Sequence, residues 1–153
     1  MISNYGSLLL LVVILLQADG SATLVDGLTI AERLQLNRKV KIEDRIKIYE
    51  SVSSRYHKSV EQAAEKQNFE RIPVLLQSWS LVLSKSLADI TQNIDRKRKS
   101  NALIKYEIRM RKSIVDIGDA RIKAPVDHQE YYDHWIDHAE EVRKHFVEIL
   151  FPR

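Results

Sequence analysis

Cysteine is absent from this chain, which excludes disulfide frameworks, thiolate chemistry and covalently attached c-type haem. Glycine and proline are scarce, with four and three among 153 residues, and this argues against a β architecture with many turns. The sequence also lacks a Gly-x-Ser-x-Gly motif and a glycine-rich phosphate loop. We therefore expect a helical protein that is held together by its apolar core and is not an enzyme.

Long apolar runs are missing too, with one short exception near the N-terminus. Residues 8–16 read LLLLVVILL, a run well short of the roughly 20 apolar residues that cross a bilayer as a helix. Small and polar residues follow, with Gly20 and Ala22 at the −3 and −1 positions of a cleavage site. Residues 1–22 are therefore predicted to be a signal peptide. Because residues 1–7 contain no lysine or arginine, an uncleaved N-terminal anchor is the alternative.

The charge balance restricts the partners of the exported protein. The net charge is +3, and removal of Asp19 with the signal peptide raises it to +4. This net positive charge is too small to indicate nucleic-acid binding. We therefore expect no specific nucleic-acid partner. Residues 23–153 fit one domain that does not span the membrane after processing. An export signal without disulfides favours a bacterial periplasmic or extracellular location.

Four segments of the chain carry apolar residues at alternating spacings of four and three, which is typical of one stripe on a helix. The stripes run over 42–63, 72–94, 103–122 and 131–150. Trp79 and Trp135 lie on them and are predicted to be buried. The third stripe is broad because Ile108, Val115 and Ile122 flank it, and the fourth is expected to begin at Tyr131.

Helix start and stop signals separate these segments. Thr29-x-x-Glu32 predicts a short leading helix that ends near residue 37, and Asp127-x-x-Glu130 predicts a second capping box. Pro73 indicates a helix start, Ser100 or Asn101 an N-cap, and Pro125 a helix stop. Short connections make consecutive helices antiparallel. The predicted fold is an all-α, up-down antiparallel bundle of four long helices with a short leading helix.

The last helix carries a stripe of candidate metal ligands. These are His134, His138, Glu141 and His145, which lie at i, i+4, i+7 and i+11. Imidazoles four residues apart on a helix can reach one ion. The stripe nevertheless lies to one side of the apolar face, so we expect at most weak binding of a divalent transition metal, through the pair His134 and His138. A solvated flank without metal is the alternative.

Two further histidines are interpreted as structural. His128 is expected to be half-buried at the start of the last helix, and His57 is expected to lie on the surface. An exported helical bundle resembles cytochrome b562 in architecture, and that family holds haem through methionine and histidine. The one methionine beyond the signal peptide, Met110, lies in mid-helix, so no haem-ligand pair is assigned and no cofactor is expected.

Basic residues gather in two connections that precede and follow the first two long helices. They are Arg38, Lys39, Lys41, Arg96, Lys97, Arg98 and Lys99. Because an antiparallel hairpin begins and ends on the same side, both groups are expected at one end of the bundle. Cations there also complement a helix C-terminus and favour solubility. The functional interpretation is attraction to an anionic partner such as acidic lipid head groups or a polyanion.

The sequence thus favours an exported, non-catalytic binding or cell-envelope-associated module whose basic end meets an anionic surface. An unknown protein is the other partner class, and the sequence does not specify an oligomeric state. The alternative function is a metal- or haem-handling bundle that uses the histidine-rich last helix.

Export predicts a defined processed form. Signal peptidase accepts small residues at −3 and −1, so the mature chain is expected to start at Thr23 or within a few residues of it. Mass spectrometry and N-terminal sequencing of the secreted or periplasmic protein check this. Recovery of full-length chain in the cytoplasm alone would contradict it.

Overall fold

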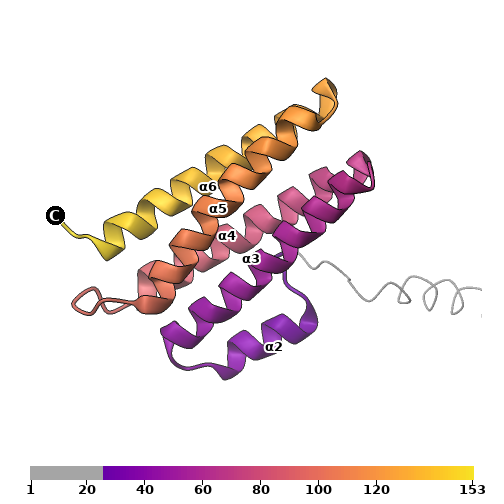
Figure 1. Cartoon of the computed structure of the whole chain (residues 1–153). Coiled ribbons are helices and arrows are strands. Elements are labelled where there is room, and N and C mark those ends of the chain that lie inside the picture. The colour runs from indigo at the N-terminus through magenta and orange to yellow at the C-terminus, as the bar shows by residue number, and fades with distance from the viewer. Residues whose placement is uncertain (1–25) are drawn as a thin grey trace, which may run out of the picture.

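The computed structural model describes residues 26–153, so the predicted signal peptide and its cleavage site lie outside the described residues. Five α-helices and two 3-10 turns follow one another along this part of the chain (Figure 1). They are α2 (Ile30–Arg38), α3 (Ile42–Glu65), η1 (Phe69–Arg71), α4 (Ile72–Asn93), α5 (Asn101–Lys123), η2 (Val126–His128) and α6 (Gln129–Leu150). The predicted all-α bundle with a short leading helix is confirmed. None of the helices in these residues is long and apolar enough to cross a membrane.

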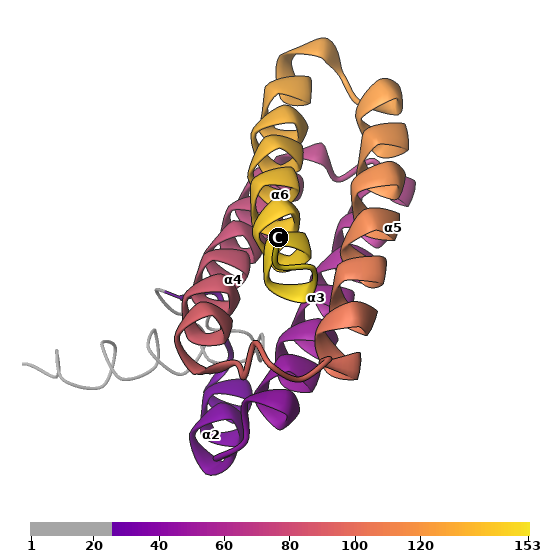
Figure 2. The same ribbon diagram turned by 90° about the vertical axis from the view of Figure 1, so that its left-hand side faces the viewer.

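Consecutive long helices run in opposite directions, yet not every consecutive pair packs side by side. α3 packs on α4 and α5 packs on α6, and the two hairpins meet through α3 against α5 and α4 against α6. The helices of these cross-hairpin pairs are parallel. α4 and α5 lie across the diagonal of the bundle (Figure 2). Residues 94–100 therefore cross the end of the bundle instead of forming a tight turn.

The helix starts follow the capping signals in most places. The Thr29 hydroxyl accepts a hydrogen bond from the Glu32 amide, and the Glu32 carboxylate accepts one from the Thr29 amide. Ser100 caps α5 by accepting from the amide of Leu103 at 3.0 Å. Pro73 lies in the first turn of α4, where its missing amide proton is of no consequence.

The predicted capping box of the last helix is wrong. Asp127 lies inside η2, and α6 begins at Gln129 with no side-chain cap. The 3-10 turn forms because the His128 amide donates to the Pro125 carbonyl at 2.9 Å, so Asp127 lacks the extended backbone that an N-cap requires.

Each long helix buries one stripe, and the four stripes share one core. Trp79 and Trp135 are each 1% exposed and their ring centroids lie 4.2 Å apart, as predicted for core residues. On α6 the buried stripe starts at Tyr132, and Tyr131 is 47% exposed. Tyr132 continues the alternation of three and four through Trp135, whereas Tyr131 falls one position outside it.

The third stripe is narrower than predicted. Ile108, Val115 and Ile122 on α5 are exposed. They recur every seven residues on the side of α5 that neither α3 nor α6 covers. A helix in a four-helix bundle packs mainly on two neighbouring helices. The part of its apolar face that extends beyond these two contacts stays exposed to water.

A chain of buried hydroxyl groups connects three helices through the core. The Tyr106 hydroxyl on α5 lies 3.1 Å from the Ser53 hydroxyl on α3 and 3.1 Å from the Ser86 hydroxyl on α4. Ser86 donates its proton to the Leu83 carbonyl at 2.8 Å. Tyr106 therefore donates to Ser86 and accepts from Ser53. Ser53 and Ser86 thus satisfy the hydrogen-bonding groups of this phenol.

The segment before α2 is fixed against the core by one glycine. Gly27 has a φ of 74° and a Cβ at this position would collide with the Ser78 carbonyl of α4. Its own carbonyl accepts a hydrogen bond from the buried Tyr56 hydroxyl at 2.6 Å. Arg55 of α3 then donates to Glu32 of α2 at 2.7 and 2.9 Å. The leading helix is thus part of the bundle.

Removal of a core indole tests the packing. The substitution Trp135→Ala is expected to lower the free energy of unfolding by about 3–5 kcal/mol, because it leaves a large cavity against Trp79. Urea denaturation followed by circular dichroism measures it. Phe151→Ala is the matched control, since Phe151 is 66% exposed and its loss should change stability by less than about 0.5 kcal/mol. A loss under about 1 kcal/mol for Trp135→Ala would contradict the assigned core.

Candidate anion-binding site

The basic residues of the two connections lie at one end of the bundle, which we call the basic end. It comprises Arg38, Lys39, Lys41, Arg96, Lys97, Arg98 and Lys99, and all seven are exposed. The α2–α3 connection, the α4–α5 connection and the C-terminal end of α6 meet there in both views of the bundle (Figures 1 and 2). The expected placement of these seven residues at one end is confirmed.

Arg45 holds the α2–α3 connection in place. Its guanidinium donates to the carbonyls of Lys39 at 3.1 Å and Val40 at 2.8 Å. The same guanidinium donates two hydrogen bonds to Asp89 of α4, at 2.8 and 2.9 Å, and the Tyr49 hydroxyl donates a third at 2.8 Å. One side chain thereby ties the connection to the hairpin of α3 and α4.

The charge of Asp89 depends on these partners. Burial by itself would raise the pKa of Asp89, but the hydrogen bonds from Arg45 and Tyr49 outweigh it, and the pKa lies below its ordinary value. With a further hydrogen bond from the Asn93 side chain at 2.8 Å, the carboxylate accepts four hydrogen bonds, and the ionised form is the one that can do so. Asp89 therefore stays charged at neutral pH and keeps the Arg45 guanidinium engaged inside the site.

Ser100 fixes the α4–α5 connection to the start of α3. Besides capping α5, its hydroxyl donates to the Glu43 carboxylate at 2.8 Å. Asp95 tightens the connection by accepting from the Lys97 amide at 3.0 Å. Residues 96–99 therefore belong to a connection that is bound to α3 through Ser100 and is tightened internally by Asp95.

Most of the positive charge at this end is not neutralised by the described part of the chain. Arg98 lies 3.7 Å from Asp95, and their side chains are 88% and 58% exposed, so this pair is weak. Within residues 26–153, the other six cations of the basic end have no carboxylate within 4.0 Å. The basic end is thus available to an external anion.

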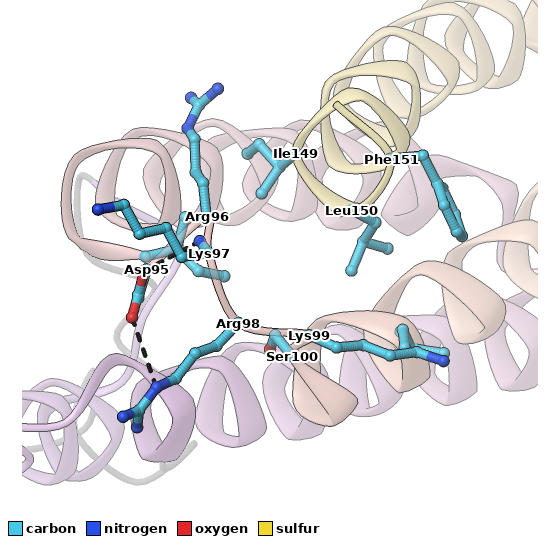
Figure 3. A pocket seen from close by; sticks show the side chains of 11 residues that line it. Asp95, Arg96, Lys97, Arg98, Lys99, Ser100, Ile149, Leu150 and Phe151 are labelled. Atoms are coloured by element: carbon cyan, nitrogen blue, oxygen red, sulfur yellow. Dashed lines mark hydrogen bonds and ion pairs between the residues drawn. The ribbon is translucent and has the colours of Figure 1, made fainter. Parts of the chain in front are cut away.

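A hollow of about 300 Å³ lies between the α4–α5 connection and the last turn of α6. Figure 3 shows Arg96, Lys97 and Arg98 pointing away from the last turn of α6, while Leu150 points into the space between the two elements. Ile94, Ile104 and Ile149 add further apolar surface, and Phe151 lies at the rim. The site combines a cationic border with an apolar lining. The cations are recognisable in the sequence, whereas the apolar lining forms only where α6 ends beside the α4–α5 connection.

The histidine stripe of α6 does not converge on one point. His134 lies 3.6 Å from Glu130, and His145 lies 3.3 Å from Glu148, each within the helix itself. Glu141 is exposed. Among residues 26–153, the stripe supplies no group of three ligand atoms within 4.8 Å of one another.

His138, the remaining member of the stripe, faces α4 instead of solvent. Its Nε2 lies 2.9 Å from the Ser84 hydroxyl and 3.3 Å from the Ser80 carbonyl. A metal ion at this nitrogen would have to replace those contacts. Weak binding through His134 and His138 stays a prediction.

The expectation for His57 is wrong. His57 is 8% exposed and its ring stacks on Trp79 at a centroid distance of 5.9 Å. It lies next to Tyr56 on the core side of α3, where α4 and α5 cover it. The position of His57 along its own helix does not predict this burial. A polar residue beside the apolar stripe is buried only where two neighbouring helices cover it. His128 is half-buried, as expected.

No protein-family model, curated protein or solved structure matches this chain. The case for function therefore depends on the geometry of the chain itself.

The lowered pKa of Asp89 makes a testable statement about acid stability. A carboxyl whose folded pKa is below its unfolded value stabilises the fold above the unfolded pKa, and this contribution is lost as the pH falls through the folded pKa. Asp89→Asn is therefore expected to be less stable than the parent at pH 7, and the difference should shrink toward pH 3. Urea denaturation at several pH values measures it.

The matched control for this series is Asp137→Asn on α6. Asp137 is exposed and has no cationic partner within 4.0 Å among residues 26–153. Its replacement should leave the pH dependence of stability as in the parent. A stability gap for Asp89→Asn that stays constant from pH 7 to pH 3 would contradict the ionic role of Asp89.

Proposed function

We propose that this protein is an exported, non-catalytic module of the bacterial cell envelope whose basic end binds an anionic lipid surface. The observation that carries the proposal is the union of seven exposed cations with an apolar hollow at one end of the bundle. Cations attract phosphate head groups, and the hollow accepts the apolar part of a lipid. A surface that recognised a soluble polyanion would need the cations alone.

Electrostatics sets the expected strength of this attraction. Each lysine or arginine near an anionic membrane surface contributes about 1 kcal/mol, and the contribution decays within a Debye length of roughly 10 Å at 0.1 M salt. The four cations of residues 96–99 supply up to about 4 kcal/mol when all of them reach the surface. Such binding is reversible and falls as the salt concentration rises.

Apolar contacts give the second part of the attraction. Phe151 is 66% exposed at the rim of the hollow, and aromatic rings are favoured at the interface between head groups and acyl chains. Ile149 is 7% exposed and holds the last turn of α6 on the core. Phe151 therefore follows a helix end that is packed on the core.

Vesicle co-sedimentation tests the proposal with the chain that starts at residue 23. Binding is expected to vesicles that contain phosphatidylglycerol and not to vesicles of phosphatidylcholine alone. Replacement of Arg96, Lys97, Arg98 and Lys99 by glutamine should weaken binding at least ten-fold, since a ten-fold change needs only about 1.4 kcal/mol. Added salt should weaken binding of the parent and have less effect on the variant.

A charge-matched control removes four cations near the opposite end of the bundle. The exposed residues Lys58, Lys66, Arg71 and Lys123 serve this purpose, and their replacement by glutamine should leave binding nearly unchanged. Phe151→Ser should weaken vesicle binding several-fold and leave binding to soluble polyphosphate unchanged. Equal loss in both four-site variants would show that net charge alone attracts the membrane, and the proposal would fail.

A further inference from the structure

His57 of α3 is held in a fixed orientation between two other helices. Its ring stacks on Trp79 of α4, and its Nδ1 lies 3.0 Å from the hydroxyl of Ser113 on α5. Ser113 is 2% exposed and His57 is 8% exposed. One ring nitrogen is therefore engaged with a neutral hydroxyl, and the ring has little freedom to turn.

The other ring nitrogen faces two carboxylates. His57 Nε2 lies 3.2 Å from Glu61 Oε1 and 3.2 Å from Asp116 Oδ2. The nitrogen is buried and has no hydrogen bond of acceptable geometry within the described residues. A buried polar atom in that position calls for a partner. Because two carboxylates lie beside this nitrogen, a positively charged partner is favoured.

These three side chains fit the requirements of a divalent transition-metal ion. Imidazole and carboxylate groups are ligands of such ions, and bond lengths to zinc of about 2.0–2.2 Å put tetrahedral ligand atoms roughly 3.3–3.6 Å apart. The two distances of 3.2 Å are close to this separation, and all three ligand atoms lie within 4.8 Å of one another. Ser113 would orient the imidazole through Nδ1, as outer-shell partners of metal-bound histidines do.

The cluster is open to solvent on one side. Glu61 and Asp116 border a groove of about 570 Å³ between α3 and α5, and Glu65 and Asp119 add two more acidic side chains to its lining. The Glu61 side chain is 50% exposed and can adjust its position. An ion could enter by this groove and complete its coordination with water.

Lys112 competes for this position. Its ammonium donates to Asp116 Oδ2 at 2.8 Å, the same oxygen that faces His57. The Lys112 side chain is 66% exposed, so it can turn into solvent when an ion arrives. The site already attracts a cation, and a metal ion would replace a flexible one.

We propose that His57, Glu61 and Asp116 bind one divalent transition-metal ion between α3 and α5. The site lies toward the end of the bundle remote from the basic end, and it is independent of the proposed membrane binding. It also differs from the histidine stripe of α6. The ion would connect two parallel helices of different hairpins, so its binding stabilises the bundle.

Calorimetric titration with Zn²⁺ of protein purified without a polyhistidine tag tests this site. One equivalent is expected to bind, with a rise in the melting temperature that increases with Zn²⁺ concentration. Asp116→Asn and Glu61→Gln should each weaken binding about ten-fold or more. Both residues lie at the groove, so the circular dichroism spectrum of each variant should match that of the parent.

Lys112→Gln provides the opposite result. Removal of the competing ammonium should tighten Zn²⁺ binding several-fold, an effect that a loss of structure cannot imitate. The double variant His134→Ala/His138→Ala is the control for the last helix and should leave this binding unchanged.

Three outcomes would overturn the proposal. They are no binding at tens of micromolar Zn²⁺, unchanged affinity in Asp116→Asn and Glu61→Gln, and loss of the site in His134→Ala/His138→Ala. The last outcome would assign the metal to the stripe on α6. None of them bears on vesicle binding, which is measured without metal.

Discussion

The burial of one phenol hydroxyl sets the arrangement on which the rest of this bundle depends. Tyr106 is fully buried and reaches hydroxyl partners on α3 and α4 at the same time. An unsatisfied hydroxyl in the core costs about 1–3 kcal/mol, so α5 can slide or turn only by breaking this chain. The position of α5 beside α3 then brings Ser113 and Asp116 to His57. A polar contact in the core thus determines a second polar cluster between α3 and α5.

The crossing of residues 94–100 has a second consequence, at the basic end. Because α4 and α5 lie on a diagonal, their connection passes over the end of the bundle and leaves a hollow beneath it, which the last turn of α6 borders. A tight turn between adjacent helices would have left no such space. The bundle carries cations around an apolar hollow at one end, while its acidic groove and histidine cluster lie toward the other. These two regions carry the two proposals.

Much of the fold could be predicted because its signals are local. The capping box at Thr29 and the N-cap at Ser100 need only residues three positions away. Burial of Trp79 and Trp135 follows from the spacing along their own helices. The failure at the start of the last helix has a local cause, since a 3-10 turn after Pro125 replaced the predicted cap. The failures at His57 and at the third stripe have a tertiary cause, because burial beside a stripe depends on which helices lie against it.

The sequence by itself determined the long helices, their order, the centres of their buried stripes and the presence of seven cations in the connections before and after the hairpin of α3 and α4. Only the tertiary structure decided which helices are neighbours. His57 and Asp116 are far apart in the sequence, and so are Arg96 and Phe151. Helix periodicity is set by hydrogen bonds within a few residues, whereas these pairs meet because apolar faces of different helices must cover one another. A face accepts more than one neighbour, so the spacing of residues along a helix cannot specify which one it meets.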